Sequence, residues 1–156
     1  GAIGRRVAEI ARAFGAKVIY YSASGAPAQE GYEQVDFETL LTQSDIISVH
    51  APLNEHTEGL INSKAFEKMK SSCIFLNLGR GPIVDEQALY NALVRNQIAA
   101  AGLDVLCEEP MSADNPLLKI KDSKRLLITP HIAWASVEAR THLMEIIHGQ
   151  VKDFFA

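Results

Sequence analysis

The sequence is poor in the residue types that mark several classes of protein. It has two cysteines, Cys73 and Cys107, in apolar stretches, and we interpret both as reduced core thiols rather than as a disulfide or a metal site. Reduced thiols are typical of a cytoplasmic protein. No apolar run approaches the length of a membrane span, no signal peptide is visible, and no internal repeat or low-complexity tract is found.

An excess of basic charge is also missing. The 15 Lys and Arg residues against 19 Asp and Glu residues give a net charge of −4, and no basic cluster argues for a nucleic-acid surface. The composition is that of a globular protein, with 47% hydrophobic and 22% charged residues. At 156 residues the chain is long enough for one domain with a substantial core, and we expect one domain over residues 1–156.

The first residues predict a phosphate-binding turn. Gly1-Ala2-Ile3-Gly4 leads into an amphipathic helix that Gly15 ends, and a short strand follows over residues 17–21. A glycine turn, a helix and a strand form the second half of a dinucleotide-binding unit, whose first glycine and first strand are not in this sequence. We therefore predict an α/β fold with a Rossmann-type doubly wound parallel sheet, cut within the glycine loop. The backbone N–H groups available to a pyrophosphate are those of Ala2, Ile3 and Gly4, and the apolar helix positions are Val7, Ile10, Ala11 and Phe14.

The acidic residue that usually binds the ribose hydroxyls of the cofactor is absent too. At the end of the strand stands Ser22, which could bond a ribose hydroxyl but would not repel a 2′-phosphate. No Arg or Lys lies beside Ser22 to clamp such a phosphate. The choice between NAD and NADP stays open, with NAD slightly favoured.

Apolar runs and amphipathic segments predict the other elements. We expect strands over residues 46–50, 73–78, 98–105 and 126–129, and helices over residues 37–43, 64–70 and 86–95 and from residue 137 onward. Parallel strands face the ligand crevice with their carboxyl ends, so His50 and Pro52 are expected to border the cofactor. For His50, a structural hydrogen bond at the strand end is an equally good interpretation. The predicted N-caps are Ser63, Asp85 and Ser136. In the helix over residues 86–95, the residues that should face inward are Ala88, Leu89, Ala92 and Leu93. One face of the last helix carries Leu143, Ile147, Val151 and Phe154.

Polar residues at the later strand ends are the candidate reactive groups. Arg80, between two glycines, could grip a carboxylate in bidentate fashion, although a solvated loop arginine is the commoner outcome. Asp104 interrupts an apolar strand and needs a partner, which a cofactor amide or ribose would supply. Glu109 and His131 could meet as an acid–base pair, because an imidazole beside a carboxylate keeps its proton to higher pH. The alternative is a surface glutamate and a surface histidine that never meet.

Together these motifs resemble those of the D-2-hydroxyacid dehydrogenase family, in order and spacing along essentially the whole chain. The segments from Glu108 to Pro110 and from Thr129 to Ala135 are further similar to glycerate dehydrogenases, also called hydroxypyruvate reductases. Formate-acting relatives resemble the chain less, because they carry Gln where Glu109 stands. The motifs that carry the family resemblance are Gly1-Ala2-Ile3-Gly4, Asn77-Leu78-Gly79-Arg80-Gly81, Gly102-Leu103-Asp104-Val105, Glu109-Pro110 and Pro130-His131.

The resemblance implies an oxidoreductase that transfers a hydride between a nicotinamide cofactor and a small D-2-hydroxy acid or 2-keto acid, such as glycerate and hydroxypyruvate or glyoxylate. Arg80 would bind the substrate carboxylate and carbonyl, His131 would be the general acid in reduction and the base in oxidation, and Glu109 would hold and tune His131. The residues expected to line the cofactor are Ala2, Ile3, Gly4, Ser22, His50, Pro52, Leu78, Gly79, Arg80, Asp104, His131 and Ala133.

The family also implies a homodimer and a second domain that contributes substrate contacts. Since that domain and the first strand are absent, we expect the isolated chain to be weakly active or inactive, and unstable unless an upstream peptide stays bound. A dinucleotide-sensing corepressor of the same fold is the alternative function, because such relatives can keep Arg80, Glu109 and His131. A short-chain dehydrogenase is disfavoured, since no Tyr-x-x-x-Lys pair stands in a suitable position.

Overall fold

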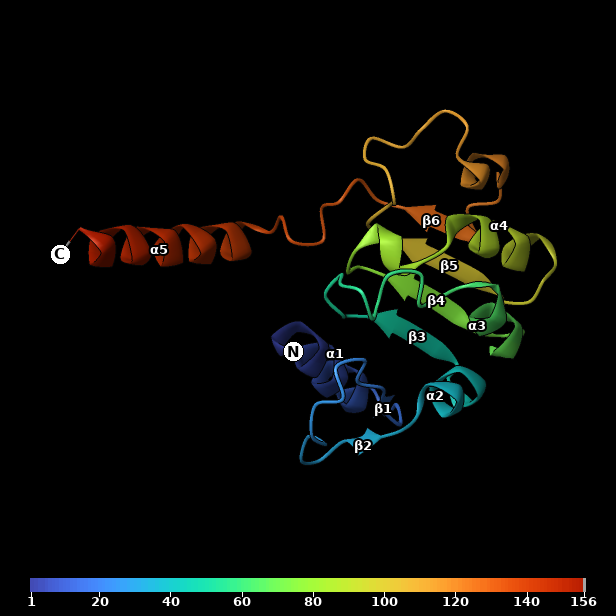
Figure 1. Ribbon diagram of the computed structural model, residues 1–156, viewed down its shortest axis with the longest axis horizontal. Coiled ribbons are helices and arrows are strands. Elements are labelled where there is room, and N and C mark those ends of the chain that lie inside the picture. The colour runs from blue at the N-terminus through green and yellow to red at the C-terminus, as the bar shows by residue number, and fades with distance from the viewer. Residues whose placement is uncertain (156) are drawn as a thin grey trace.

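All strand pairs in the described part of the chain, residues 1–155 of this computed structural model, are parallel (Figure 1). Four strands form one sheet in the order β3-β4-β5-β6, and two shorter strands form a second sheet. The main sheet contains β3 (Ile46–Val49), β4 (Ile74–Asn77), β5 (Ala100–Leu103) and β6 (Leu126–Ile128), and the small sheet contains β1 (Ile19–Tyr20) and β2 (Glu33–Gln34). The predicted parallel α/β sheet is confirmed.

The two sheets are separate, because no strand pair within residues 1–155 joins them. β1 pairs only with β2, and β3 pairs only with β4, so each has one edge without a partner strand. Strand β2 was not expected, because Glu33 and Gln34 are polar, exposed and too few to produce an alternating pattern. Its pairing with β1 depends on contacts that no local pattern records.

Three helices pack on the main sheet and form its core. They are α2 (Phe37–Gln43), α3 (Ser63–Lys68) and α4 (Glu86–Val94), and α3 contacts both of the others. The rings of Phe66 on α3 and Phe75 on β4 meet edge to face, with centroids 5.5 Å apart, and both are fully buried. The four residues of α4 that were predicted to face inward are also buried: Ala88, Leu89, Ala92 and Leu93.

Several details correct the sequence predictions. Asn62, not Ser63, caps α3, because its side-chain oxygen accepts a hydrogen bond from the N–H of Ala65 at 3.2 Å. Two short 3₁₀ helices, Gly81–Ile83 and Pro116–Lys119, lie where the sequence predicts neither a helix nor a strand. Cys73 is buried as expected, whereas Cys107 is exposed, because the turn after β5 carries it to the rim of a cavity.

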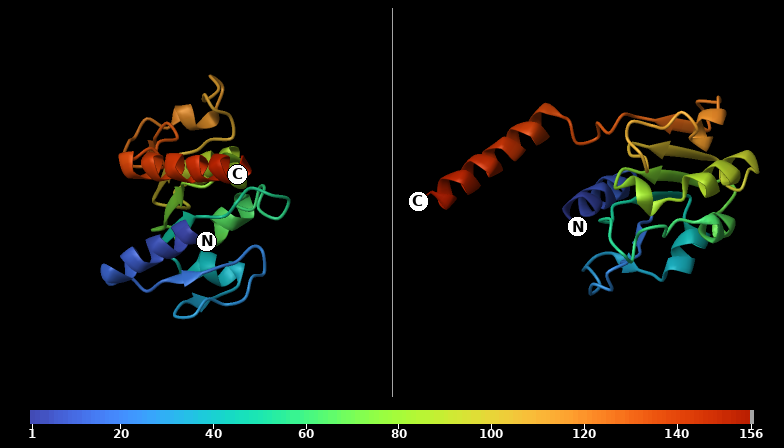
Figure 2. Two further views of the ribbon diagram at one scale, coloured as in Figure 1. Left: turned by 90° about the vertical axis from the view of Figure 1, so that its left-hand side faces the viewer. Right: turned by 45° about the horizontal axis from the view of Figure 1, so that its top comes forward.

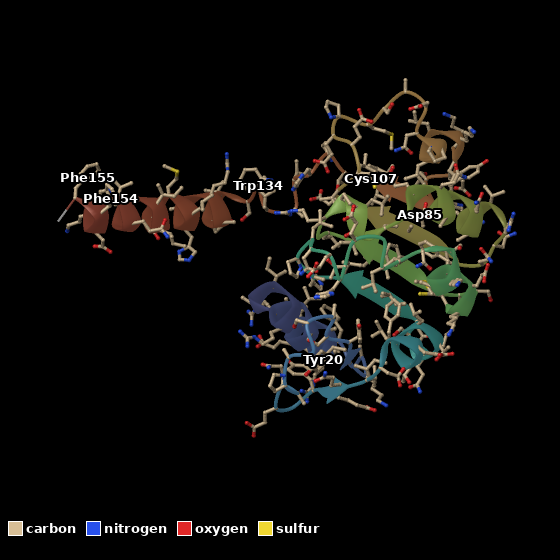
Figure 3. All side chains as sticks on the ribbon, in the orientation of Figure 1. Tyr20, Asp85, Cys107, Trp134, Phe154 and Phe155 are labelled. Carbon is tan, nitrogen blue, oxygen red and sulfur yellow. The ribbon has the colours of Figure 1, made fainter. Side chains whose placement is uncertain are left out.

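The first and last helices differ from the other three, because neither buries a single residue. They are α1 (Ala2–Ala13) and α5 (Val137–Phe154). α5 extends away from the rest of the molecule in Figure 1 and in the right-hand view of Figure 2, and Phe154 and Phe155 are exposed at its far end (Figure 3). Within residues 1–155, no helix is long and apolar enough to cross a membrane.

Candidate active site

The candidate site lies at the carboxyl ends of β4, β5 and β6. Because the strands are parallel, the segments that follow them emerge at one edge of the sheet. A cavity of about 210 Å³ opens there. The three predicted catalytic residues all line it, and the full lining is Arg80, Gly81, Pro82, Val105, Leu106, Cys107, Glu109 and His131.

Arg80 is held in place by the end of β4. The fully buried side chain of Asn77 accepts a hydrogen bond from the N–H of Gly79 at 3.1 Å and donates one to the carbonyl of Arg80 at 3.0 Å. This turn presents the guanidinium to solvent, and its only hydrogen bond in the described chain is to the carbonyl of Gly79, at 2.8 Å. No carboxylate within residues 1–155 forms an ion pair with Arg80. The guanidinium therefore has donors free for an external anion.

Glu109 and His131 meet, with 2.7 Å between a carboxylate oxygen and the Nδ1 atom of the imidazole. The other oxygen of Glu109 accepts a hydrogen bond from the N–H of Leu106 at 2.8 Å. This backbone bond, and then the bond to His131, hold the pKa of Glu109 below its ordinary value, so the carboxylate is ionised near neutral pH. An ionised carboxylate can only accept, so Nδ1 carries the proton and Nε2 remains for a ligand in the cavity.

The backbone of His131 is in an unusual conformation that Asp104 stabilises. The φ angle of His131 is 54°, in the left-handed region that costs a residue with a side chain about 1–3 kcal/mol. The carboxylate of Asp104 accepts hydrogen bonds from the N–H groups of Ile132 and Ala133, both at 2.9 Å, and from the hydroxyl of Thr129. Asp104 thus holds the turn on both sides of His131.

The same hydrogen bonds set the charge of Asp104. Burial would raise its pKa, but the bonds from Thr129, Ala133 and Ile132 outweigh burial and hold the pKa below its ordinary value. From the sequence, Asp104 needs a partner, which a cofactor amide or ribose would supply. The chain itself supplies three donors, so burial of Asp104 does not by itself indicate a ligand.

The predicted phosphate-binding turn is the start of α1. Gly1 takes the N-cap position without a side-chain hydrogen bond to the first turn, which leaves the first N–H groups of the helix available to an anion. Gly4 lies against His50 at the end of β3, because a Cβ atom on Gly4 would be 3.3 Å from the Cβ of His50. The helix start and the edge of the main sheet are therefore adjacent.

His50 itself has a structural partner, as one of the two sequence interpretations proposed. An imidazole nitrogen lies 2.9 Å from the hydroxyl of Ser48, and burial lowers the pKa of His50. The other predicted cofactor residues are less enclosed. Pro52 and Leu78 are exposed, Gly79 approaches the carbonyl of Ala51, and the hydroxyl of Ser22 bonds Ser24 and the N–H of Ala26.

Sequence reasoning missed the residues that hold these groups in place. Asn77 and Thr129 looked like ordinary strand-end residues, although a polar residue at the end of a buried strand is a usable signal. Trp134, which lies just before α5 (Figure 3), also holds this turn, because its indole N–H donates to the carbonyl of His131 at 2.9 Å. Cys107 lines the cavity; although the residue is exposed, partial burial of its thiol, and then the nearby charge of Glu86, raises the pKa of the thiol to about 11.

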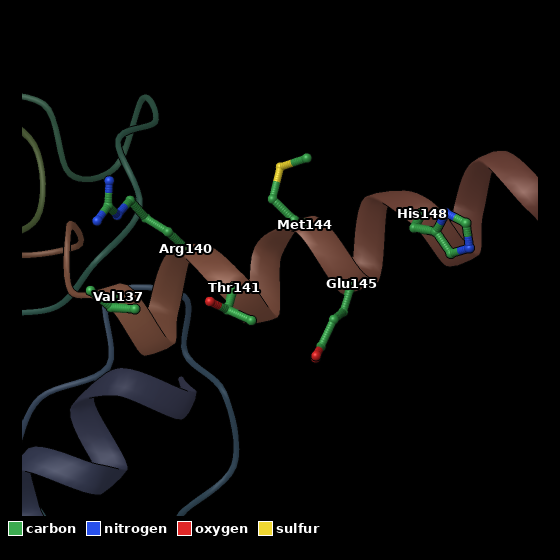
Figure 4. A pocket seen from close by; sticks show the side chains of 6 residues that line it. All are labelled: Val137, Arg140, Thr141, Met144, Glu145 and His148. Carbon is green, nitrogen blue, oxygen red and sulfur yellow. The ribbon is translucent and has the colours of Figure 1, made fainter.

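A larger depression, of about 590 Å³, lies along α5 (Figure 4). Its lining comes from that helix alone and contains none of the predicted site residues: Val137, Arg140, Thr141, Met144, Glu145 and His148. These residues follow one another at helical spacing along one face of α5, and no other element of the described chain lines the depression, so this is an open surface and not an enclosed site.

The fold and the site define an α/β nucleotide-binding domain with an acid–base pair and a free guanidinium at one sheet edge. Residues 1–133 match the family described as "D-isomer specific 2-hydroxyacid dehydrogenase, NAD binding domain", and the chain belongs to this family.

Relatives and solved structures agree with this assignment. The chain is 45% identical over 156 residues to a hydroxypyruvate reductase of Blautia hydrogenotrophica, covering 99% of this chain and 48% of that protein. It is 44% identical to a glyoxylate reductase of Thermococcus litoralis, covering 94% of this chain and 44% of the relative. The chain thus spans about half the length of the curated relatives it matches.

Two solved structures share the fold over nearly the whole chain. A D-lactate dehydrogenase from Aquifex aeolicus with NAD and lactic acid has a TM-score of 0.90 and 31% identity, over 99% of this chain and 51% of that one. An acyclic imino acid reductase in complex with NADPH and D-Arg has a TM-score of 0.89 and 39% identity, over 99% of this chain and 48% of that one.

Proposed function

We propose that residues 1–156 form the dinucleotide-binding domain of an enzyme that interconverts a small D-2-hydroxy acid and its 2-keto acid. The observation that carries this proposal is the 2.7 Å contact between Glu109 and His131 at a cavity that Arg80 also lines. An anion-binding cation beside an acid–base pair is what reduction of a keto acid requires.

Arg80 binds the substrate in this proposal. Its guanidinium has no ion-pair partner among residues 1–155, and it can take a carboxylate through two parallel hydrogen bonds. Asn77 fixes the turn on which Arg80 stands, so the cation is presented from a rigid strand end. The substrate's carbonyl is then directed toward His131 across the cavity.

His131 moves the proton. Its Nε2 gives a proton to the carbonyl oxygen during reduction and takes one from the hydroxyl during oxidation, while Nδ1 stays bonded to Glu109. Glu109 stabilises the charged imidazole and fixes its orientation, and Asp104 holds the backbone turn of His131 through the N–H groups of Ile132 and Ala133. A bound nicotinamide supplies or accepts the hydride.

The residues at the glycine turn and the strand ends fit a dinucleotide. The uncapped start of α1 offers N–H groups to a pyrophosphate, and Gly4 lets that turn approach the end of β3. NAD is favoured because Ser22 has no Lys or Arg among its hydrogen-bond partners, although the solved relatives bind NAD in one case and NADPH in another. The residues proposed to hold the cofactor are Ala2, Ile3, Gly4, Ser22, His50, Pro52, Leu78, Gly79, Arg80, Asp104, His131 and Ala133.

The proposed substrates are hydroxypyruvate and glyoxylate, with glycerate in the reverse direction. Relatives with 45% and 44% identity carry the names hydroxypyruvate reductase and glyoxylate reductase. We also propose a homodimer in the cytoplasm. The exposed apolar residues of α1 and α5 support an association surface, and the two unpaired cysteines support a reducing compartment.

The test uses the full-length protein and follows oxidation of NADH and NADPH with hydroxypyruvate, glyoxylate and pyruvate. We expect turnover on a 2-keto acid and a loss of about 100- to 10,000-fold in kcat for His131→Ala, because the proton donor is removed. His142→Ala, on α5, is the matched control and should keep full turnover. Dinucleotide binding without turnover on any keto acid would favour the sensing corepressor instead.

A further inference from the structure

The segment that carries Glu109 is held from outside the cavity by Glu86, the first residue of α4. One oxygen of the Glu86 carboxylate accepts a hydrogen bond from the N–H of Cys107 at 2.7 Å. The other oxygen accepts one from the side-chain amide of Asn115, also at 2.7 Å. Glu86 therefore grips the segment on both sides of Glu109, and it does not itself line the cavity.

The hydrogen bond from Cys107 to Glu86 lies in the turn at Leu106 and Cys107, which orients Glu109. Adjacent backbone N–H groups in this turn bind two different carboxylates, Leu106 to Glu109 at 2.8 Å and Cys107 to Glu86 at 2.7 Å. The thiol of Cys107 adds a hydrogen bond to the carbonyl of Val84 at 3.5 Å. The N–H that orients Glu109 is therefore directly next to the N–H that Glu86 holds.

The same turn lies directly against the loop that carries Arg80. A Cβ atom on Gly81 would stand 1.9 Å from the carbonyl oxygen of Leu106 and 2.5 Å from the nitrogen of Cys107. Only glycine allows the two backbones to approach this closely. The Leu106–Cys107 peptide is thus the point where the loops of Arg80 and Glu109 meet.

We propose that Glu86 is a positioning residue, which sets Glu109 and His131 against Arg80 by holding the N–H of Cys107 and the amide of Asn115. This inference rests on the proposed function, because it concerns the geometry of that reaction. Glu86 does not itself line the cavity, and within the described chain it forms no hydrogen bond with a predicted cofactor residue.

A simpler role would be favourable charge at the start of α4, where a carboxylate suits the helix dipole. Asp85 already caps this helix through a 2.9 Å bond to the N–H of Ala88. The two roles predict different behaviour of Glu86→Gln. Glutamine keeps one acceptor for Cys107, but its amide group would face the donor amide of Asn115. That amide cannot be reversed freely, because the Asn115 oxygen already accepts from the N–H of Leu117 at 3.0 Å.

The experiment compares Glu86→Gln and Glu86→Ala with the matched control Glu38→Gln in the full-length protein. Glu38 is an acidic residue in the first turn of α2, outside the site. We expect Glu86→Ala to lower kcat for keto-acid reduction by about 10- to 100-fold, because a small displacement of the acid–base pair is costly. Glu86→Gln should lie between Glu86→Ala and the unchanged protein, and the Kd for the dinucleotide should not change in either.

Other results would overturn either the positioning role of Glu86 or the proposed function. Equal losses in Glu86→Gln and Glu86→Ala, with a lowered Tm in both, would assign Glu86 to helix stability and overturn the positioning role. An unchanged kcat in Glu86→Ala while His131→Ala is inactive would reject the inference and leave the proposed function intact. Full turnover by His131→Ala would reject the proposed function and the inference together. If Glu86→Ala fails to fold, the kcat of Glu86→Gln decides, and an unchanged value overturns the role.

Discussion

Helices α4 and α5 begin alike but lie in opposite surroundings. Each has an N-cap side chain bonded to the N–H three residues on, from Asp85 to Ala88 at 2.9 Å and from Ser136 to Ala139 at 3.2 Å. α4 then buries four apolar residues, whereas α5 buries none and leaves Leu143 47% exposed. The comparison shows that an amphipathic sequence predicts a helix and its apolar face, but not what covers that face.

Topology explains the difference. α4 connects β4 and β5, which pair with one another, so the helix packs against the sheet that these two strands form. α5 follows β6, and within residues 1–155 it does not connect two paired strands. α1 is in a similar position, since it leads to β1, whose other edge has no partner strand. The two helices that bury no residue, α1 and α5, therefore do not connect paired strands within residues 1–155.

The largest expected effect comes from removing matched leucines on α4 and α5. Leu89 is fully buried, and Leu89→Ala should lower the free energy of unfolding by about 2–5 kcal/mol through lost burial and a residual cavity. Leu143→Ala in this chain should change it by less than about 0.5 kcal/mol, because the side chain already contacts water. Urea unfolding followed by circular dichroism measures both.

Repeating the pair in the full-length protein sharpens the comparison. A cost for Leu143→Ala that appears only there would show that α5 packs on the remainder of the protein or on a second copy. Equal costs for Leu89→Ala and Leu143→Ala in the isolated chain would contradict the view that α5 is uncovered.

Asp104→Asn should lower the free energy of unfolding by an intermediate amount, because it removes a hydrogen bond that holds the turn at His131. An amide placed at the Asp104 carboxylate leaves a donor facing the N–H of Ala133 or of Ile132, and an unsatisfied buried group costs about 1–3 kcal/mol. Thermal unfolding at neutral pH measures the loss, and Asp153→Asn on exposed α5 is the control.

The pH dependence follows from the same carboxylate. The folded pKa of Asp104 is lowered, so its contribution to stability is present above the ordinary pKa and is lost as the pH falls from about 4 through the lowered value. Asp104→Asn should lack this part of the acid destabilisation. If the variant loses stability with falling pH as steeply as the unchanged protein, another group is responsible.

Removing the N-cap side chains of α4 and α5 should have the smallest effects on the free energy of unfolding. These effects should again be different in the two helices. Asp85→Ala removes the cap of a buried helix and should cost about 1 kcal/mol of global stability. Ser136→Ala should fray α5 and leave the unfolding midpoint of the sheet unchanged, because α5 does not pack on it. Hydrogen exchange of the α5 amides, beside a urea titration, separates the two. A shared loss of global stability in both variants would mean that α5 is coupled to the core.

Local patterns were sufficient for much of the fold and for part of the site. α2 has the predicted bounds, and the caps Asp85 and Ser136 are confirmed, because capping depends on residues a few positions apart. The cap of α3 was misplaced by one residue, since Asn62 and Ser63 are both good N-cap types. The meeting of Glu109 and His131 was one of two alternatives, and the structure selects it because β5 and β6 are paired.

The sequence by itself determined the parallel α/β class, most helices and the order of the polar groups that follow the strands, because these depend on periodicity and on short-range chemistry. Only the tertiary structure decided which groups touch. Gly81 against the Leu106–Cys107 peptide, Glu86 on Cys107 and Asn115, and Asp104 around His131 each join residues far apart in the chain. Such contacts arise when neighbouring strands bring their following loops to one edge, which no local pattern encodes.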